Sequence, residues 1–150
     1  MGSANSPPPG TNHGSSAVCL AGDRIVLVSR DGVRWEFPAG RPEGVETLLE
    51  TLRREVREEA CCDVQTAELL GFTTSRCLEG AERGLVLVRA HWAVRARSLA
   101  WQPVHEIAQK VELPIAAAMS ALTVEPGLSP ICEQIWVRAL ESFGWQPGLA

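Results

Sequence analysis

Apolar runs separated by turn residues predict short strands in the first part of the chain. Residues 17–21 and 24–29 are apolar and rich in β-branched side chains, and Gly22-Asp23 between them predicts a tight turn. A further short strand is expected at 34–37. Prolines and glycines alternate from Pro38 to Gly44, which predicts a loop there.

The period of the pattern changes after this loop. Thr47 and Glu50 stand at the spacing of a capping box, in which each side chain accepts a hydrogen bond from the other residue's backbone. Apolar residues then recur at helical spacing, at Leu49, Leu52, Val56 and Ala60. We therefore expect a helix from about Leu48 to Ala60.

The rest of the chain predicts two more strands and two more helices. Residues 64–77 and 84–95 have strand-like composition, with a turn at 80–84. One helix is expected to begin near Pro114, and another after Ser129-Pro130 that ends at Gly144. Strands, helix, strands and helices in this order predict an α+β fold in which helices flank a mixed sheet.

Composition indicates one domain and excludes several kinds of partner. The chain has 150 residues and is 45% hydrophobic, which suffices for a single core. We expect a flexible leader rich in Pro, Gly and Ser at 1–15, a domain at 16–146 and a flexible tail at 147–150. A net charge of −4 argues against a nucleic-acid polymer. We expect no membrane span because no apolar run approaches the ~20 residues that one needs.

Cysteine usage predicts a reducing compartment. The five cysteines are an odd number without C-x-x-C spacing, which argues against a disulfide framework and a zinc ribbon. The N-terminus also lacks the apolar segment of a secretory signal. The expected location is the cytoplasm.

The predicted helix carries an acidic patch beside its apolar stripe. Glu55, Glu58 and Glu59 are spaced at i, i+3 and i+4, so their carboxylates converge at the edge of the core. Such oxygen ligands suit Mg²⁺ or Mn²⁺. Arg54 lies four residues after Glu50 and four before Glu58, where it can brace the patch. The alternative is a solvated helix face held by salt bridges.

The residues around this patch resemble the Nudix box, G-x5-E-x7-R-E-U-x-E-E-x-G-U, where U is aliphatic. The matching positions are Gly40, Glu46, Arg54, Glu55, Glu58 and Glu59, with Val56 as the aliphatic residue. The preceding WEFPAG, residues 35–40, is similar to the family's W-x-x-P-G-G. Three positions depart from the pattern: Ala39, Val45 and Cys61. A side chain at Cys61, the box's last glycine position, would disfavour a left-handed helix end by roughly 1 kcal/mol.

The resemblance implies the Nudix fold, an α/β/α sandwich, and a hydrolase that cleaves a phosphoanhydride (pyrophosphate) bond in a nucleoside diphosphate-linked or nucleoside triphosphate substrate. It implies that Glu55, Glu58, Glu59 and the Gly40 carbonyl bind Mg²⁺ or Mn²⁺. By the same analogy Glu46 supports the loop and helix, and Arg54 holds a metal-binding glutamate. The general base is then Glu58 or Glu59, with Glu106 as an alternative.

Contacts to the substrate are less specified. Arg30 and Arg41 are candidates for binding phosphate, and each also fits an ordinary exposed arginine. Trp35 is a candidate for stacking on a base, as are Phe72, Trp92 and Trp101, although buried aromatics are more common than stacking platforms. The chain has no tyrosine, so the tyrosine typical of dinucleoside polyphosphate hydrolases is missing.

Two other functions share the expected fold. A nucleotide sensor would bind without turnover, although its usual mark, the loss of box glutamates, is not seen here. A prenyl diphosphate isomerase would need a catalytic cysteine and additional histidine ligands, and the chain has three scattered histidines. The sequence does not determine the oligomeric state, and the resemblance allows a homodimer.

Overall fold

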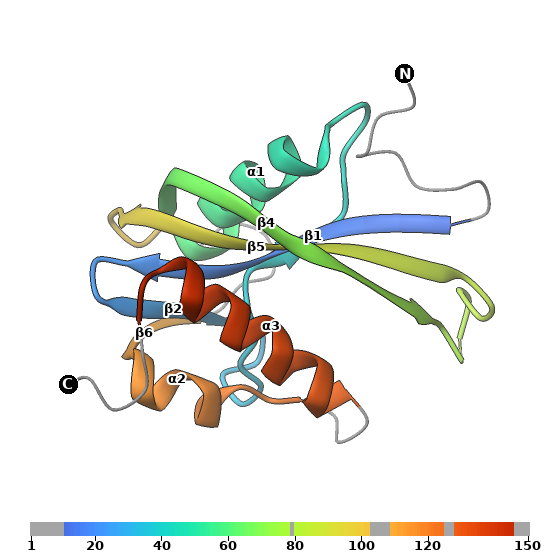
Figure 1. Cartoon of the computed structure of the whole chain (residues 1–150). Helices are drawn as coiled ribbons and strands as arrows, with labels where there is room; N and C mark the ends of the chain where they lie inside the picture. The colour runs from blue at the N-terminus through green and yellow to red at the C-terminus, as the bar shows by residue number, and fades with distance from the viewer. Residues whose placement is uncertain (1–10, 79, 103–108, 125–127, 146–150) are drawn as a thin grey trace.

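One mixed sheet of six strands forms the centre of the protein, and helices cover both of its faces (Figure 1). The computed structural model describes residues 11–78, 80–102, 109–124 and 128–145. The strands are β1 (Thr11–Ala21), β2 (Arg24–Ser29), β3 (Ala39–Gly40), β4 (Cys62–Arg76), β5 (Val86–Ser98) and β6 (Gln109–Pro114). The helices are α1 (Leu48–Ala60), α2 (Ile115–Ala121) and α3 (Ser129–Ser142). The α+β prediction is confirmed.

The strand order is β4-β5-β1-β2-β6, with β3 paired to β1. β1 and β5 run parallel along their whole length, whereas the other pairs are antiparallel. A parallel pair requires a crossover connection rather than a tight turn, and α1 lies in the connection between β1 and β5. The first half of β1 therefore lies beside β3, which leads into α1.

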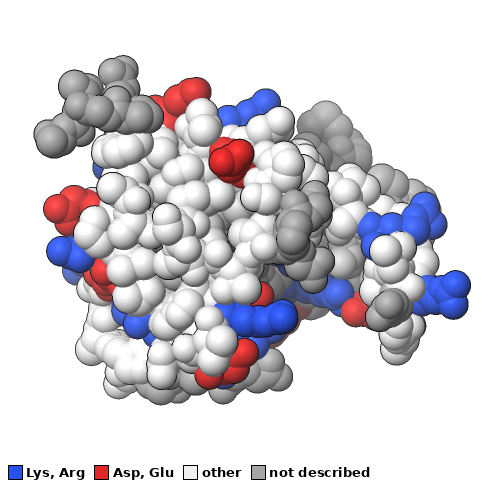
Figure 2. Space-filling view, turned by 90° about the horizontal axis from the view of Figure 1, so that it is seen from below, with Lys and Arg blue, Asp and Glu red and all other residues white. Residues whose placement is uncertain are grey.

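The second helical layer consists of α2 and α3. Alternate residues of the sheet, among them Val18, Ile25 and Leu27, face this layer and pack against Trp136 and Leu140. The rings of Phe37 and Trp136 stack with centroids 6.3 Å apart. Viewed from this side, the centre of the face is largely uncharged, and charged side chains lie toward its rim (Figure 2).

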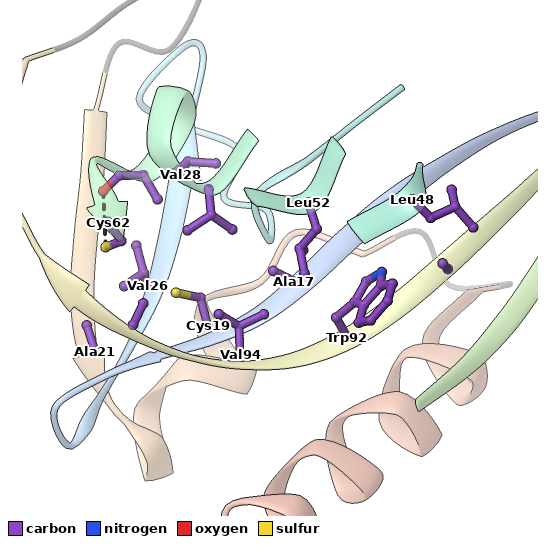
Figure 3. Close-up of a cluster of buried hydrophobic side chains, with 14 residues drawn as sticks. Ala17, Cys19, Ala21, Val26, Val28, Leu48, Leu52, Cys62, Trp92 and Val94 are labelled. Carbon is purple, nitrogen blue, oxygen red and sulfur yellow. Dashed lines mark hydrogen bonds between the residues drawn. The ribbon is translucent and has the colours of Figure 1, made fainter. Parts of the chain in front are cut away.

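The layer on the opposite face is α1. Leu52, Val56 and Ala60 of the predicted stripe are buried against β1, β2 and β5. The first residue of the stripe is Leu48 and not Leu49, which is only partly buried. In Figure 3, Leu48 and Leu52 lie over Ala17 and Trp92. Burying each large aliphatic side chain contributes about 1.5–3 kcal/mol, so this stripe fixes α1 on the sheet. Helices on both faces complete the α/β/α sandwich.

The helix α1 begins and ends for local reasons. Both hydrogen bonds of the predicted capping box are present, between Thr47 and Glu50. At the other end, Cys61 has φ 49° and ψ 47°, which is the left-handed conformation. Its N–H bonds to the carbonyl of Arg57 at 3.2 Å. Cys61 is the non-glycine residue with positive φ among the described residues, so the side chain at this position is held in a conformation that favours glycine.

Three details of the predicted elements were wrong. The expected strand at 34–37 is reduced to one bridge, between Val28 and Glu36, because Asp31 accepts the N–H groups of Val33 and Arg34 and turns the chain. The predicted loop at 38–44 contains β3. The strand β6 was not predicted, and it pairs with the whole of β2.

The expected boundary of the leader also needs correction. β1 begins at Thr11, so it includes residues assigned to the leader of 1–15. Their polar and small side chains gave no strand signal, but their backbone pairs with β5. Ser15 is buried, donates to the carbonyl of Leu48 and accepts the Trp92 indole N–H. Residues 1–10 and 147–150 lie outside the described part of the chain.

None of the helices in the described ranges combines the length and the hydrophobicity that a bilayer span requires.

The strain at Cys61 can be measured with a pair of variants that differ by one methyl group. We expect Cys61→Gly to have a higher free energy of unfolding than Cys61→Ala, by about 1 kcal/mol, because glycine adopts positive φ without a steric cost. Urea denaturation gives both values. The same pair at Cys132, inside α3, should show the opposite order, since alanine is the better helix former there. An equal or reversed order at position 61 would contradict the assignment of strain.

Candidate active site

The box residues meet where β3 passes the second half of α1. Gly40 ends β3 and lies against the Glu55 carboxyl so closely that a Cβ on Gly40 would collide with it. Glu59 lies one turn further along the helix, and its Oε1 accepts the N–H of Ala39 at 2.9 Å. Two glutamates of α1 therefore contact two consecutive residues of β3, and this contact sets the position of the loop relative to the helix.

Arg54 is the centre of the acidic cluster. Its Nε and Nη2 donate to the two oxygens of Glu46 at 2.8 and 3.1 Å. Its Nη1 donates to Glu55 Oε1 at 2.7 Å and to Glu58 Oε2 at 3.1 Å. A further hydrogen bond, 2.9 Å long, runs from Nη2 to the carbonyl of Arg41. One guanidinium therefore joins the loop before α1 to two glutamates on the helix, while Glu50, which the spacing also placed near Arg54, closes the capping box.

Glu46 is held ionised by these contacts. The hydrogen bonds from Arg54 lower the pKa of Glu46 to about 2, and the same pairing raises the pKa of Arg54 above its usual value. Glu46 Oε1 also accepts the N–H of Glu43 and the hydroxyl of Thr51. A carboxylate with this many donors has a structural role, because it connects the loop, the start of the helix and Arg54.

Glu59 has the opposite environment. Its side chain is 11% exposed, and its Oε2 lies 3.7 Å from the Arg30 guanidinium. Burial raises the pKa of Glu59 to about 7, and burial also raises the pKa of Glu55. Two desolvated carboxyl groups on one helix face repel each other when both are ionised, and a cation between them would relieve this repulsion.

The donor set fits a hard divalent cation. Glu55, Glu58 and Glu59 supply only oxygen ligands, which Mg²⁺ and Mn²⁺ prefer. Within the described residues, no three acidic, His or Cys side chains are already arranged as a metal-ligand cluster. Arg54 occupies one oxygen each of Glu55 and Glu58, and the Ala39 N–H occupies one oxygen of Glu59. The role of the Gly40 carbonyl as a ligand remains a prediction.

The other predicted site residues are not all in this cluster. Arg30 lies at its edge beside Glu59, and Arg41 forms two hydrogen bonds to Glu82, of 2.8 and 3.1 Å. Trp35 instead packs with the hydrophobic cluster of α2 and α3, so the structure does not place it with the carboxylates. Glu106, the alternative base, lies outside the described residues.

One charged residue near this cluster was missed from the sequence. Arg89 is exposed on β5 and is close enough to Glu36 and Glu59 to interact with both electrostatically. The signal was present in V-L-V-R-A-H-W, where one arginine interrupts an apolar strand. Whether Arg89 lies near the cluster depends on which strand pairs with β5, and strand composition does not predict the pairing.

Comparison with known proteins agrees with this geometry. A family model described as NUDIX domain matches residues 11–121. A stretch of 37 residues is 60% identical to part of the 8-oxo-dGDP phosphatase NUDT18 of Danio rerio. It covers 25% of this chain and 11% of that protein, so the match concerns a small part of the relative.

Solved structures show the same fold. The Bacillus subtilis pyrophosphohydrolase BsRppH aligns with a TM-score of 0.68 and 22% identity, over 95% of this chain and 90% of its own. The NUDIX domain of Shewanella oneidensis NrtR, solved in complex with ADP ribose, aligns with a TM-score of 0.68 and 18% identity, over 93% and 95% of the two chains. These likenesses confirm the predicted fold.

The link between Glu46 and Arg54 should contribute measurably to stability. We expect Glu46→Gln to lower the free energy of unfolding at pH 7 by about 1.5–3 kcal/mol, because Arg54 loses its charged acceptor. The pKa of Glu46 is about 2 in the folded protein, against 4.5 as the reference. The stabilisation that ionised Glu46 gives is therefore complete above pH 4.5, and it is lost as the pH falls from 4.5 toward about 2. Urea denaturation at pH 7 and pH 3.5 tests this, with Glu133→Gln on exposed α3 as the control. A constant difference between the two pH values would contradict it.

Burial of Glu59 should make the metal-free protein less stable as the pH rises. Its pKa is raised from 4.5 to about 7. The stabilisation from protonated Glu59 is therefore fully present below pH 4.5 and is lost as the pH rises through about 7. We expect the stability of the wild type relative to Glu59→Gln to fall by up to about 3 kcal/mol between pH 4.5 and 8. Thermal or urea denaturation in EDTA measures it. The lowered pKa of His91 acts in the opposite direction, but it is common to both proteins. Parallel pH profiles would disprove the assignment.

Proposed function

The chain belongs to the NUDIX domain family, and on that premise we propose that it is a divalent-metal-dependent hydrolase of nucleotides. The bond cleaved is a phosphoanhydride bond, in a nucleoside diphosphate-linked or nucleoside triphosphate substrate. The observation that carries the proposal is the junction of β3 and α1. There Gly40 lies against Glu55, Arg54 donates to Glu46, Glu55 and Glu58, and Glu59 accepts the N–H of Ala39, the neighbour of Gly40.

The cation is proposed to be Mg²⁺ or Mn²⁺, held by Glu55, Glu58, Glu59 and the Gly40 carbonyl. When bound, such an ion neutralises charge on phosphate oxygens and lowers the pKa of a coordinated water. Arg54 acts on the protein side of this site. It fixes the side chains of Glu55 and Glu58 from behind, and Glu46 fixes Arg54 in turn, so the carboxylates need little rearrangement during the reaction.

Glu59 is the proposed general base. A base works best when its pKa lies near the pH at which it operates, and in the metal-free protein burial raises the pKa of Glu59 to about 7. In the proposed step the water oxygen attacks phosphorus, the anhydride P–O bond breaks, and the leaving phosphate takes the bond's electron pair. The carboxylate of Glu59 accepts the water's proton. The Ala39 N–H holds Glu59 Oε1 in place, and Oε2 lies 3.7 Å from the Arg30 guanidinium at the edge of the site.

The substrate is proposed to be a purine nucleoside diphosphate or triphosphate, with 8-oxo-dGDP as the first candidate. The support for this candidate is the 37-residue similarity to the Danio rerio 8-oxo-dGDP phosphatase, which covers 11% of that protein. The net charge of −4 is consistent with a small ligand bound through a metal and local arginines rather than through a basic surface. The cytoplasmic location and the homodimer stay predictions.

The catalytic assignment can be tested with a panel of nucleotides and a phosphate-release assay. We expect hydrolysis that stops with EDTA, returns with Mg²⁺, and falls by a factor of at least ~100 in Glu58→Gln and in Glu59→Gln, because each removes a carboxylate from the reacting centre. Glu133→Gln is the matched control and should keep full activity.

Two results would decide against this proposal. Undiminished activity in both glutamine variants would show that the box carboxylates do not take part. Tight nucleotide binding by the wild type, without product from any member of the panel in Mg²⁺ or Mn²⁺, would favour the sensor without turnover.

A further inference from the structure

Arg89 is an exposed cation on an otherwise apolar strand. Its neighbours Ala90 and Trp92 belong to the core under α1, so Arg89 faces the opposite side of the sheet, as do His91 and Ala93. Across the described ranges, no hydrogen bond or ion pair engages the Arg89 guanidinium. The Arg89 side chain reaches solvent, and partial burial of its charge lowers its pKa.

The sheet register places Arg89 in line with the candidate active site. Arg89 pairs with Gly14 on β1, and the next residue of β1, Ser15, pairs with Gly40 on β3. Two strand spacings separate β5 from β3, or about 10 Å. Gly14 has no side chain, and a Cβ there would lie 2.6 Å from the Gly40 carbonyl oxygen. The space beside Gly14 is therefore filled by the Gly40 carbonyl, and the register brings this proposed metal ligand next to the strand position that pairs with Arg89.

The charges around Arg89 also belong to the active site. It interacts electrostatically with Glu36, Arg41 and Glu59, and its charge helps to keep His91 neutral, since the pKa of His91 is lowered to about 4, chiefly by burial. Charged side chains of both signs are visible in the recess beside the projecting end of the β4–β5 hairpin (Figure 2). A guanidinium next to acidic side chains, but not bonded to them, is available to an anionic ligand.

A small cavity lies on the far side of Arg89 from the carboxylates. It has a volume of about 170 Å³ and is lined by residues of β4, β5 and α3, including Phe72, Thr73, His91 and Gln134. Thr73 is the register partner of Arg89. Sites for whole drug-sized ligands are larger, about 300–1,000 Å³, so this cavity has room for a ring but not for a nucleotide with its phosphates. The phosphates of a ligand seated here would lie outside it, toward Arg89.

We propose that Arg89 binds a phosphate group of the substrate, on the side away from the α1 carboxylates. This inference rests on the proposed function, because it takes a nucleotide as the ligand. The guanidinium can form two parallel hydrogen bonds to phosphate oxygens, and the carboxylates with their cation hold the phosphate chain from the other side. The phosphate chain then lies between Arg89 on β5 and the Gly40 carbonyl at the end of β3.

The test is binding of two phosphate probes that are not consumed, α,β-methylene-GDP with Mg²⁺ and inorganic pyrophosphate with Mg²⁺, measured by calorimetry. We expect Arg89→Gln to raise Kd for both by at least tenfold, as for loss of charge-assisted hydrogen bonds. In turnover, KM should rise by a similar factor while kcat stays within about threefold of wild type, since the contact is made in the ground state as well. Arg97→Gln, on the same face and strand but at the far end beside Asp63, is the matched control and should bind like wild type.

The outcomes separate this inference from the proposed function. A wild type that binds both probes but hydrolyses no nucleotide refutes the hydrolase, while the Kd of Arg89→Gln still decides the role of Arg89. A Kd within twofold of wild type overturns the inference, as does a loss seen with the GDP analogue but not with pyrophosphate, or a wild type that binds neither probe. If Arg89→Gln does not fold, Arg89→Lys replaces it. That variant keeps the charge without the paired hydrogen bonds, and we expect at least a threefold rise in Kd. An unchanged Kd would overturn the inference.

Discussion

The pairing of Arg54 with Glu46 is the interaction on which the active site depends. It joins the loop after β3 to the first turns of α1 through two hydrogen bonds, and the remaining Arg54 donors reach Glu55, Glu58 and the Arg41 carbonyl. Carboxylates crowded on one helix face repel each other, and a single half-buried guanidinium offsets that repulsion at low cost because every donor has a partner. The Thr51–Glu46 bond, the Ala39–Glu59 bond and the capping box of Thr47 and Glu50 also link this loop to the helix.

Carboxyl groups within this cluster have very different pKa values. Glu46 accepts several hydrogen bonds and has a pKa of about 2, whereas Glu59 is desolvated and has a pKa of about 7. Environments that push the pKa values of neighbouring acids apart are a means by which proteins assign a structural role to one and a chemical role to another. Here the difference follows from position, because Glu46 lies among donors at the start of the helix and Glu59 lies under β3, next to the core.

One face of the sheet is a closed hydrophobic core, and the other includes a cavity. The face under α1 is closed by the stripe from Leu48 to Ala60 and by buried residues of β1, β2 and β5 (Figure 3). The opposite face is covered by α2 and α3 and includes the cavity between α3 and β4. The parallel pairing of β1 with β5 connects these two regions, since it places Arg89 beside Gly14, and Gly14 lies beside the end of β3. A site that needs carboxylates from one layer and a cation from the other can only form across such a junction.

The sequence alone determined the features that are encoded within a few residues of each other. The bounds of α1, its capping box, the buried Leu52, Val56 and Ala60, and the turn at Gly22 follow from local hydrogen bonding and side-chain spacing. Cys61 adopts the left-handed conformation of the box glycine although its side chain disfavours it. The six matching box residues also sufficed to identify the family, because their spacing reflects one loop and one helix.

Tertiary structure decided what depends on residues far apart in the chain. The polar start of β1 is a strand because β5 pairs with it, and β6 is a strand because β2 does, so neither could be read from composition. Trp35 carries the same sequence signal as a base-stacking residue but packs against α2 and α3. The lone arginine of β5, Arg89, comes near Gly14 and the end of β3 only through the β5-β1-β3 register. The pKa values differ among glutamates of identical chemistry because burial is a property of the packed protein and not of the residue. Local bonding therefore specifies the elements, and non-local pairing and desolvation specify which of their side chains form the site.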